Sequence, residues 1–552
     1  MNISTSIRKL TYLFVVLFIG LSGSLVYWQV VVADKVTANP HNGRNCLAEN
    51  AGVRGRIFDR NGVLLADSQP DPHGLCGYTR HYYYANVPGL SAVLGYYAPG
   101  YQSFGIEAQY DDYLSGRVGM TALDNLVNKT LHNTPHGSDI YLTIDIRIEK
   151  IADKHFDDPV YTDNSSAFPT NRGSIVITNP HTGEILALVS RPGYDPNKMV
   201  QSLNEGNFDY YNQLVQDTVG RPLRDHPLQE AYPPGSTYKT VTLMAGLNYG
   251  ATTLDEQFDQ KHALGPITYN GHNIGPSGNN LSYVGEVGPS GYTKYFPVST
   301  NYGFSHSDNV IFAQVAVKTG YDNWMNFNKE FYVGQKIPFD LPVTTSSVEP
   351  DGHHLNDVEL ASDAFGQGFD LITPLQLSLF NSTVANDGNF MKPMLVKKIT
   401  DKDNNIIASY DPTSLGHPIT SQTATNVRQA MYGVTFCGSG LVPRVMVNSS
   451  PWGIISKTGT AQVSDNLSIP AHSWFITEAP YSVNNPSQLP ALAIVAMKEN
   501  GGEGGKINGP ETTSIYNDIF TQIPDYSNLK APGVASSTYC CQAKLLQIGP
   551  GC

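Results

Sequence analysis

The chain has 552 residues, a net charge of −13 at pH 7 and only 15% charged residues. This length predicts more than one domain and a substantial buried core. The charged fraction is well below the average of about 25%. The acidic balance argues against nucleic acid or an anionic membrane surface as the main partner. Abundant Tyr, Asn, Gly and Ser suit an extracytoplasmic protein with many loops.

The first predicted element is a membrane helix. Residues 10–33 carry no charge, and as a helix they would span about 36 Å, enough to cross a bilayer. Arg8 and Lys9 precede the apolar run, which predicts a cytoplasmic N-terminus (residues 1–9) and an extracytoplasmic remainder. The alternative is a cleaved signal peptide, since residues 31–33 loosely fit a cleavage site. We favour an uncleaved anchor because the apolar run is longer than a usual signal core.

The cysteine content fits an oxidising compartment. The six cysteines are Cys46, Cys76, Cys437, Cys540, Cys541 and Cys552. The natural local pair is Cys46 with Cys76, whereas the last three pair within the tail or with Cys437. Their spacing lacks Cys-x-x-Cys and a nearby His pair, so we predict no metal site.

Residues 34–165 are predicted to form a first outer module. Apolar residues at 57–58 and 63–65 flank Asn61-Gly62, which predicts a hairpin with a type I′ turn, because Asn and Gly tolerate positive φ angles. A strand and a helix are expected between residues 141 and 155.

Residues 166–530 are predicted to form a second, larger module, followed by a loosely structured tail, 531–552. Two apolar runs joined by a turn at residues 179–183 predict neighbouring antiparallel strands. The other predicted helices run from near 236 to 250, over 310–318 and over 373–385. Strands are predicted around 454–463 and 492–498. Residues 265–300 are predicted to be a loop, and the glycine-rich 501–505 a flexible turn where no helix follows at once. The pattern is α+β, with helices around a largely antiparallel sheet.

Three short motifs follow one another along the second module. They are Ser236-Thr237-Tyr238-Lys239, Ser307-Asp308-Asn309 and Lys457-Thr458-Gly459-Thr460. Weaker copies occur at residues 6–9, 527–530, 464–466 and 318–320, but these lack the order and the flanking residues. Together the ordered motifs supply a nucleophile, its base, a proton shuttle and a carboxylate clamp.

The first motif places a base beside a serine. The pKa of a serine hydroxyl is far too high for attack without a neighbouring proton acceptor. Lys239 lies three residues after Ser236, on the same helix face one turn on. A lysine is a base at neutral pH only if burial or a nearby cation lowers its pKa, and Lys457 could provide that charge. For an isolated motif the alternative would be an exposed Lys with an N-capping Ser.

These motifs and their surroundings resemble the class B penicillin-binding proteins. The resemblance rests on residues 232–239 (Tyr-Pro-Pro-Gly-Ser-Thr-Tyr-Lys), 456–461, 54–62, 366–368 with 373–376, and 105–116, the last being most like the short actinobacterial penicillin-binding protein A type. It implies a β-lactamase/transpeptidase-like domain on a smaller pedestal domain. The pedestal is then residues 34–165, and we use that name for them below.

The resemblance also implies roles for the remaining motif residues. Ser307, with Lys457, passes a proton to the leaving amine, and Asn309 hydrogen-bonds the substrate backbone. Thr458, Gly459 and Thr460, together with Lys457, form the clamp for the terminal carboxylate of a D-Ala-D-Ala peptide. The backbone N–H groups of Ser236 and Thr460 form the oxyanion hole. Ser307-Asp308-Asn309 can also cap the following helix, with Asp308 facing solvent.

The implied function is a membrane-anchored peptidoglycan D,D-transpeptidase of cell wall synthesis, inhibited by β-lactams. We expect no cofactor, and the implied partner is a membrane glycosyltransferase of the shape, elongation, division and sporulation type. Between residues 307 and 457 no Glu is followed four residues later by Asn, so the deacylating Glu of class A β-lactamases is missing. The alternatives are a D,D-carboxypeptidase or β-lactamase-like hydrolase, and a β-lactam sensor or non-catalytic divisome scaffold.

Overall fold

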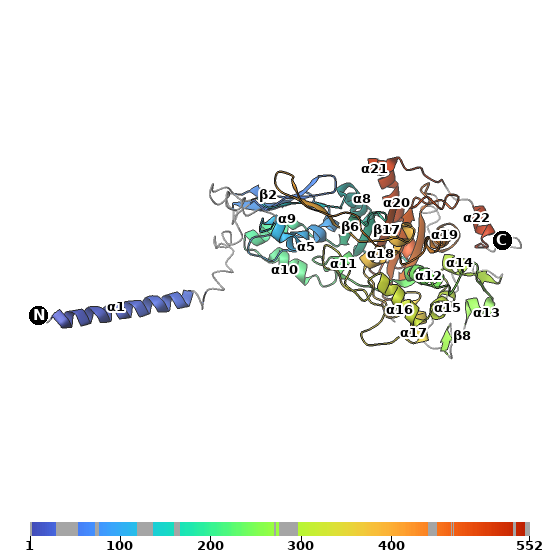
Figure 1. Cartoon of the computed structure of the whole chain (residues 1–552), viewed down its shortest axis with the longest axis horizontal. Helices are drawn as coiled ribbons and strands as arrows, with labels where there is room; N and C mark the ends of the chain where they lie inside the picture. The colour runs from blue at the N-terminus through green and yellow to red at the C-terminus, as the bar shows by residue number, and fades with distance from the viewer. Residues whose placement is uncertain are drawn as a thin grey trace.

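The computed structural model describes residues 3–28, 32, 53–71, 77–118, 136–158, 166–265, 267–269, 272–274, 296–439, 450–464, 466, 468–533 and 537–546. Helix α1 (Ile3–Val26) stands at one end of the long axis and α22 (Ser537–Gln542) near the other (Figure 1). Within α1, the segment Lys9–Val26 is apolar and long enough to cross a membrane, and none of it is buried. The helix begins and ends earlier than the predicted span 10–33, whose last residues lie partly outside the described ranges.

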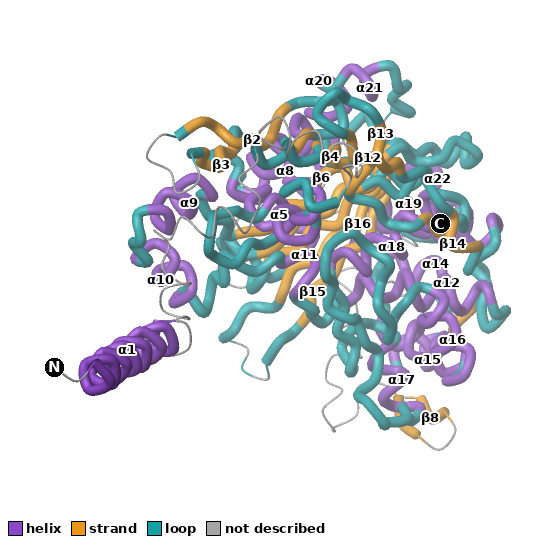
Figure 2. The backbone as a smooth tube through the Cα atoms, turned by 60° about the vertical axis from the view of Figure 1, so that its left-hand side comes forward, coloured by secondary structure: helices purple, strands orange, loops and turns teal. Residues whose placement is uncertain are grey.

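A six-stranded sheet forms the core of the pedestal, in the order β13-β12-β4-β1-β2-β3. Its strands are β1 (Ile57–Phe58), β2 (Leu64–Pro70), β3 (Tyr78–Tyr82), β4 (Asp139–Leu142), β12 (Val396–Thr400) and β13 (Ile406–Ser409). The last two come from sequence that we assigned to the second module, and β12 pairs antiparallel with β4 (Figure 2). The chain therefore returns to the first sheet, so the two modules share a continuous set of strands.

The predicted hairpin at Asn61-Gly62 is confirmed, since β1 and β2 are antiparallel, but its turn type was wrong. Gly62 has a φ of 82°, and Asn61 does not have a positive φ. The Asp59 carboxylate accepts hydrogen bonds from the N–H groups of Asn61 and Val63, both at 2.8 Å. A side-chain acceptor two residues before Asn61 thus organises the turn, which removes the need for a type I′ geometry.

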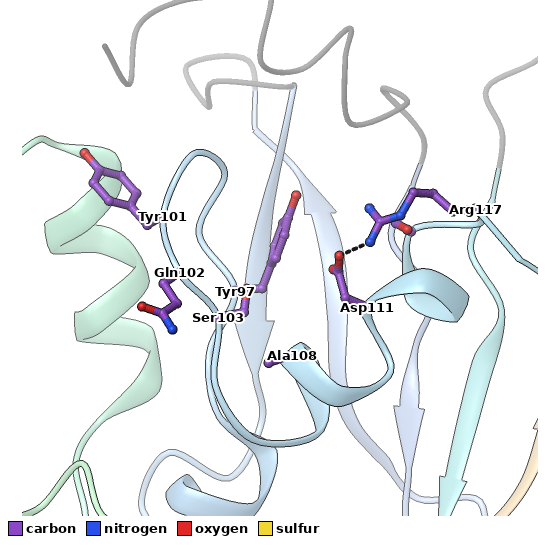
Figure 3. Close-up of a pocket in the computed structure, with 8 residues that line it drawn as sticks. Tyr97, Tyr101, Gln102, Ser103, Ala108, Asp111 and Arg117 are labelled. Atoms are coloured by element: carbon purple, nitrogen blue, oxygen red, sulfur yellow. Dashed lines mark hydrogen bonds and ion pairs between the residues drawn. The ribbon is translucent and has the colours of Figure 1, made fainter. Parts of the chain in front are cut away.

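A pocket of about 340 Å³ lies in the pedestal, away from the three motifs (Figure 3). It is lined by Tyr97, Tyr101, Gln102, Ser103, Ala108, Asp111, Ser115 and Arg117. Arg117 forms an ion pair with Asp111 on one side, and the Tyr97 ring stands between this pair and Tyr101. None of the lining residues belongs to a motif.

The second large sheet is fully antiparallel, in the order β15-β16-β17-β5-β6. Its strands are β5 (Gly173–Thr178), β6 (Ile185–Arg191), β15 (Ile455–Ala461), β16 (His472–Ala479) and β17 (Leu492–Lys498). Helices α8 (Ile146–Phe156) and α20 (Gly504–Gln522) cover one face, and α18 (Pro374–Ala385) covers the other. Alternate strand side chains enter the two cores, which confirms the predicted α+β fold.

The first two motifs lie on or next to helices packed beside this sheet, and the third lies on its strand β15. The principal helices are η3 (Gly235–Tyr238), α12 (Lys239–Asn248), α14 (Thr300–Ser305), α15 (Asn309–Thr319), α16 (Tyr321–Glu330), α17 (Asp357–Asp363) and α19 (Ser421–Cys437). The predicted helices at 310–318 and 373–385 are confirmed as α15 and α18. The helix predicted from near 236 is also confirmed, but it begins with the tight 3₁₀ turn η3.

Shorter elements complete the described chain. They are η2 (Pro88–Leu90), α4 (Ser91–Leu94), α5 (Gly105–Gln109), α6 (Asp111–Leu114), α9 (Pro196–Asn204), α10 (Asp209–Gln216), α11 (His226–Gln229), β7 (Gln257–Phe258), α13 (Gln260–Leu264), β8 (Ile267–Tyr269), β9 (His272–Ile274), β10 (Val298–Ser299), β11 (Phe390–Met391), β14 (Ser414–Gly416) and α21 (Pro524–Ser527). The hairpin β8–β9 lies within residues 265–300, predicted to be a loop, of which 275–295 are not described.

Two further predictions need correction. A helix follows the glycine-rich turn directly, because α20 begins at Gly504. The tail is not loose where it is described: α22 packs on α19, and the disulfide Cys437–Cys540 joins the two helices. This confirms the alternative in which Cys437 pairs with the tail. The proposed Cys46–Cys76 pair lies outside the described residues.

We expect the double substitution Cys437→Ser, Cys540→Ser to destabilise the second module. The disulfide closes a loop across a sequence separation of 103 residues, and removing a crosslink of this kind typically costs about 2–4 kcal/mol because the unfolded chain gains freedom. Denaturant unfolding of the purified outer segment should show the loss as a lower midpoint. Gln422→Ala, exposed on the same helix, is the matched control. An unchanged midpoint in the double variant would contradict the expectation.

Candidate active site

The first motif sits where a 3₁₀ turn changes into a helix. Gly235 has a φ of 56°, which turns the chain into η3, and Ser236 follows it with its side chain half-buried. Lys239 is the first residue of α12 and is fully buried. Its Nζ donates to Ser236 Oγ at 3.2 Å. The sequence spacing therefore gives the expected contact between a reachable hydroxyl and a buried amine.

The second motif approaches the same amine from the start of α15. Ser307 has a φ of 61°, in the left-handed region that non-glycine residues rarely occupy. In this conformation its backbone oxygen accepts a hydrogen bond from Lys239 Nζ at 2.5 Å, and its Oγ accepts another at 3.1 Å. Asn309 Oδ1 also accepts from Lys239 Nζ, at 2.5 Å. An observed strain of this kind is characteristic of functional sites.

Asp308 does not face solvent, contrary to the sequence expectation. It is 6% exposed, and its carboxylate caps α15 by accepting from the N–H of Ile311 at 2.9 Å. The capping alternative considered from the sequence is thus confirmed. Because the cap is an acid, a negative charge lies next to the buried Lys239.

The third motif occupies the edge strand of the five-stranded sheet. Lys457 is fully buried, and its Nζ donates to Ser307 Oγ and to the backbone oxygen of Thr458, both at 3.0 Å. Ser307 Oγ therefore lies between the amines of Lys239 and Lys457. The neighbouring Thr460 is exposed. Strand β15 pairs on one side with β16, and among the described strands none pairs with its other side.

The electrostatics of the two lysines favour neutral amines. Burial lowers the pKa of Lys239 to about 7, and the charge of Asp308 opposes that shift. Burial also lowers the pKa of Lys457 well below its ordinary value, with a further contribution from the charge of Lys239. Two ammonium groups sharing one hydroxyl would repel each other, so the site holds at most one charge easily near neutral pH.

Close glycine contacts join the first motif to the third. A side chain at Gly459 would place its Cβ 2.8 Å from Thr237 Cγ2 and 2.9 Å from Trp474 Cβ. A Cβ on Gly235 would lie 2.7 Å from the backbone oxygen of Thr460. The turn η3 and the end of β15 are therefore in direct contact, as the predicted oxyanion hole of Ser236 and Thr460 would require.

Several supporting residues were not predicted as part of the site. Tyr232 donates through its hydroxyl to Glu499 Oε1 at 2.8 Å, and Trp474 Nε1 donates to the backbone oxygen of Pro233 at 2.9 Å. Burial alone would raise the pKa of Glu499, but hydrogen bonds from His226 and Tyr232 and the charge of Arg221 lower it to about 2. Glu499 and Trp474 are far from the first motif in sequence, so no local pattern could link them to Tyr232 and Pro233.

Ser439 was also missed. It follows the disulfide-bonded end of α19, and its Oγ lies 3.1 Å from Thr458 Oγ1. The third motif is thereby joined to the end of α19. Among the described residues, no group of three or more His, Cys, Asp or Glu side chains could hold a metal ion.

Comparison with protein families identifies two segments. Residues 173–521 match the penicillin-binding protein transpeptidase domain, and residues 54–140 match the penicillin-binding protein A dimerisation domain. The first match covers all three motifs and most of the sheet and helices around them. The second covers strands β1 to β3 and part of β4.

Individual relatives match over nearly the whole chain. Peptidoglycan D,D-transpeptidase PbpA of Mycolicibacterium smegmatis is 29% identical over 522 residues, 92% of this chain and 97% of the relative. PbpA of Mycobacterium tuberculosis is 28% identical, with the same coverage. The solved ceftriaxone acyl-enzyme complex of penicillin-binding protein A from M. tuberculosis has a TM-score of 0.70 at 26% identity, and covers 85% of this chain and 99% of that structure. This chain therefore belongs to the penicillin-binding protein transpeptidase family, as a class B member of the penicillin-binding protein A type.

Proposed function

We propose that Ser236 carries the acyl group in this enzyme, a peptidoglycan D,D-transpeptidase of cell wall synthesis. The observation that supports this most is the contact of the half-buried Ser236 hydroxyl with a fully buried lysine whose pKa is lowered to about 7. A neutral Lys239 is able to accept the hydroxyl proton as Oγ attacks. The acyl-enzyme complex solved for the M. tuberculosis relative supports the same covalent chemistry here.

In the proposed reaction, Ser236 Oγ attacks the carbonyl carbon between the two D-Ala residues of a stem peptide, and its proton passes to Lys239 Nζ. The resulting ammonium is stabilised by the oxygen acceptors already around it, on Ser307 and Asn309. The peptide C–N bond then breaks, and the leaving D-Ala amine takes a proton through Ser307 Oγ, which contacts both lysines. An amine of a neighbouring stem peptide then attacks the ester, loses a proton to this relay, and restores the Ser236 hydroxyl.

The edge of β15 is the proposed binding strand for the donor peptide. Among the described strands, none pairs with the outer side of β15. An extended peptide can bind along this side through backbone hydrogen bonds, as an additional strand of the sheet. Thr458 and Thr460, with Lys457, hold the terminal carboxylate, and Gly459 leaves room for the nucleophile turn. Asn309 binds the peptide backbone. The backbone N–H groups of Ser236 and Thr460 stabilise the oxyanion, each worth about 3 kcal/mol when correctly aimed.

We further propose that α1 remains as a single membrane anchor, with the N-terminus in the cytoplasm and the catalytic module outside. Arg8 and Lys9 on the cytoplasmic side support this orientation. The anchor and the pedestal, residues 34–165, would contact a membrane glycosyltransferase of the shape, elongation, division and sporulation type. In this arrangement the catalytic module spans residues 166–530, and the tail spans 531–552.

Labelling with a fluorescent penicillin tests the nucleophile. The purified outer segment, from Asp34 on, should form a stable covalent adduct that Ser236→Ala abolishes. The matched control is Ser527→Ala, because Ser527 and Lys530 form another Ser-x-x-Lys. A label that clears within seconds would support a hydrolase. A folded protein without any label would support a non-catalytic scaffold, and a label without cross-linking of stem peptides would support a sensor.

The pH dependence of acylation tests the base. Since Lys239 must be neutral to accept a proton and its pKa is lowered to about 7, the acylation rate should rise between about pH 6 and 8 with a midpoint near 7. Lys239→Arg, which stays charged, should slow acylation by about 10²–10⁴-fold. Lys530→Arg is the control for lysine substitution elsewhere. A rate independent of pH over this range would refute Lys239 as the base.

Asp308→Asn separates the charge of the helix cap from its structural role. Asn caps a helix about as well as Asp, but it removes the charge that raises the pKa of Lys239. The midpoint of the acylation profile should therefore move to lower pH, while the unfolding midpoint stays close to that of the wild type. A shift to higher pH would contradict this account.

A further inference from the structure

Two buried carboxyl groups lie behind the nucleophile segment. Asp363 ends α17 and is 0% exposed, and Asp370 lies in the following loop and is 1% exposed. One oxygen of each group has a backbone partner: Asp363 Oδ1 accepts from the N–H of Phe369 at 2.7 Å, and Asp370 Oδ1 from that of Gly368 at 3.0 Å. Both Oδ2 atoms are buried and have no hydrogen-bond donor among the described residues. Neither carboxyl forms a salt bridge there.

Each of the two carboxyl groups can supply the hydrogen-bond partner that the other lacks. They lie close enough to affect each other's pKa, and a hydrogen bond between them requires a proton on one of them, because two ionised carboxylates have no donor and repel. One shared proton would satisfy both Oδ2 atoms at once. Burial raises the pKa of both groups, and the charge of Asp370 raises that of Asp363 further. The other titratable groups around the pair are Glu349, Glu359 and Tyr238, which are acidic, and His353, whose Nε2 lies 3.0 Å from Glu359 Oε2 and whose ring packs on Phe369.

The loop held by this pair contacts the first motif. Gly366 accepts a hydrogen bond from the N–H of Gly235 at 3.0 Å, and a Cβ on Gly366 would lie 2.1 Å from the oxygen of Gly235. Two residues after Asp370, Ile372 exchanges backbone hydrogen bonds with Tyr232, at 2.9 and 3.0 Å. The loop thus contacts the nucleophile segment on both sides of the Pro233-Pro234 pair.

The same loop also contacts the third motif. Gln367 Oε1 accepts from the N–H of Gln462, which directly follows β15, at 3.2 Å. Gly368 must be glycine, because a Cβ there would lie 1.8 Å from Asp363 Oδ1. The Asp363 carboxyl therefore folds back over the Gly366–Gly368 turn and fixes it between the Ser236 segment and the end of β15.

We infer that Asp363 and Asp370 share one proton and act as positioning residues that hold the Gly366–Gly368 turn against the Ser236 segment. This inference rests on the proposed role of Ser236 as the acylated nucleophile. When the shared proton is lost at alkaline pH, two buried negative charges face each other beside Glu349 and Glu359. The turn then moves, and the Ser236 segment loses its alignment with β15. The acylation rate therefore falls at alkaline pH. This fall does not come from Lys239, because that amine is already neutral in this pH range.

The stability of the folded protein also depends on whether the carboxyl pair holds this shared proton. Because the folded-state pKa of the pair lies above that of the unfolded acids, its stabilising contribution is present at acid pH and is lost as pH rises through the folded-state pKa. Asp370→Asn replaces the shared proton with an amide donor that does not titrate. The unfolding midpoint of this variant should therefore rise relative to the wild type between pH 5 and 9.

The experiment measures acylation by fluorescent penicillin from pH 6 to 10 in the purified outer segment. The wild type should lose rate several-fold toward pH 10, whereas Asp370→Asn should keep its rate there and stay within about threefold of the wild type at pH 7. Asp370→Ala, which leaves Asp363 unpaired, should acylate at least tenfold more slowly at every pH. The control is Asp322→Asn, exposed on α16.

Three results would overturn the inference: an alkaline loss that persists in Asp370→Asn, a wild-type rate in Asp370→Ala, or unfolding midpoints of wild type and Asp370→Asn that run parallel with pH. If the wild type is not labelled at Ser236, the proposed nucleophile fails instead. The unfolding midpoints then still decide whether the carboxyl pair shares a proton, because that measurement does not depend on the reaction.

Discussion

The active site depends on the burial of one amine without an ion-pair partner in direct contact. The Nζ of Lys239 contacts oxygens of Ser236, Ser307 and Asn309, and none of these is a carboxylate. An ammonium in such a place loses hydration without gaining a salt bridge, so the neutral amine is favoured near neutral pH. The charge of Lys239 in turn lowers the pKa of the second buried lysine, Lys457, which burial also lowers. The second and third motifs therefore help to bury Lys239 in addition to supplying side chains to the site.

The two sheets make this burial possible. The partners of Ser307 Oγ come from positions 68 and 150 residues away in sequence, so their alignment depends on rigid elements. The five-stranded sheet is covered on both faces, and its edge strand β15 is the one that carries Lys457. An uncovered edge invites association with another strand. Here part of β15 packs against the turn η3, which carries Ser236.

Much of this arrangement was predictable from sequence. Local patterns correctly predicted helices α15 and α18, the antiparallel strands β5 and β6, and the contact between Ser236 and Lys239, because each depends on spacing within one element. Features decided by tertiary contact were not predictable. The acidic cap at Asp308 was expected to face solvent, although α15 and the buried lysine enclose it. The return of β12 and β13 to the pedestal sheet depends on pairing with β4, far away in sequence, and the Tyr232–Glu499 bond depends on a fold that no local pattern describes.

Several parts of the site are individually unfavourable. Ser307 in the left-handed region costs about 1–2 kcal/mol, and each buried amine or carboxyl loses hydration. These groups keep their positions because neighbouring segments leave no alternative: Gly235, Gly366 and Gly459 allow backbones to approach within distances that any side chain would prevent. The same close packing means that a small movement of the Gly366–Gly368 turn reaches both the Ser236 segment and the end of β15. The precision needed for acylation and the sensitivity of the site to one buried proton therefore have a common structural origin.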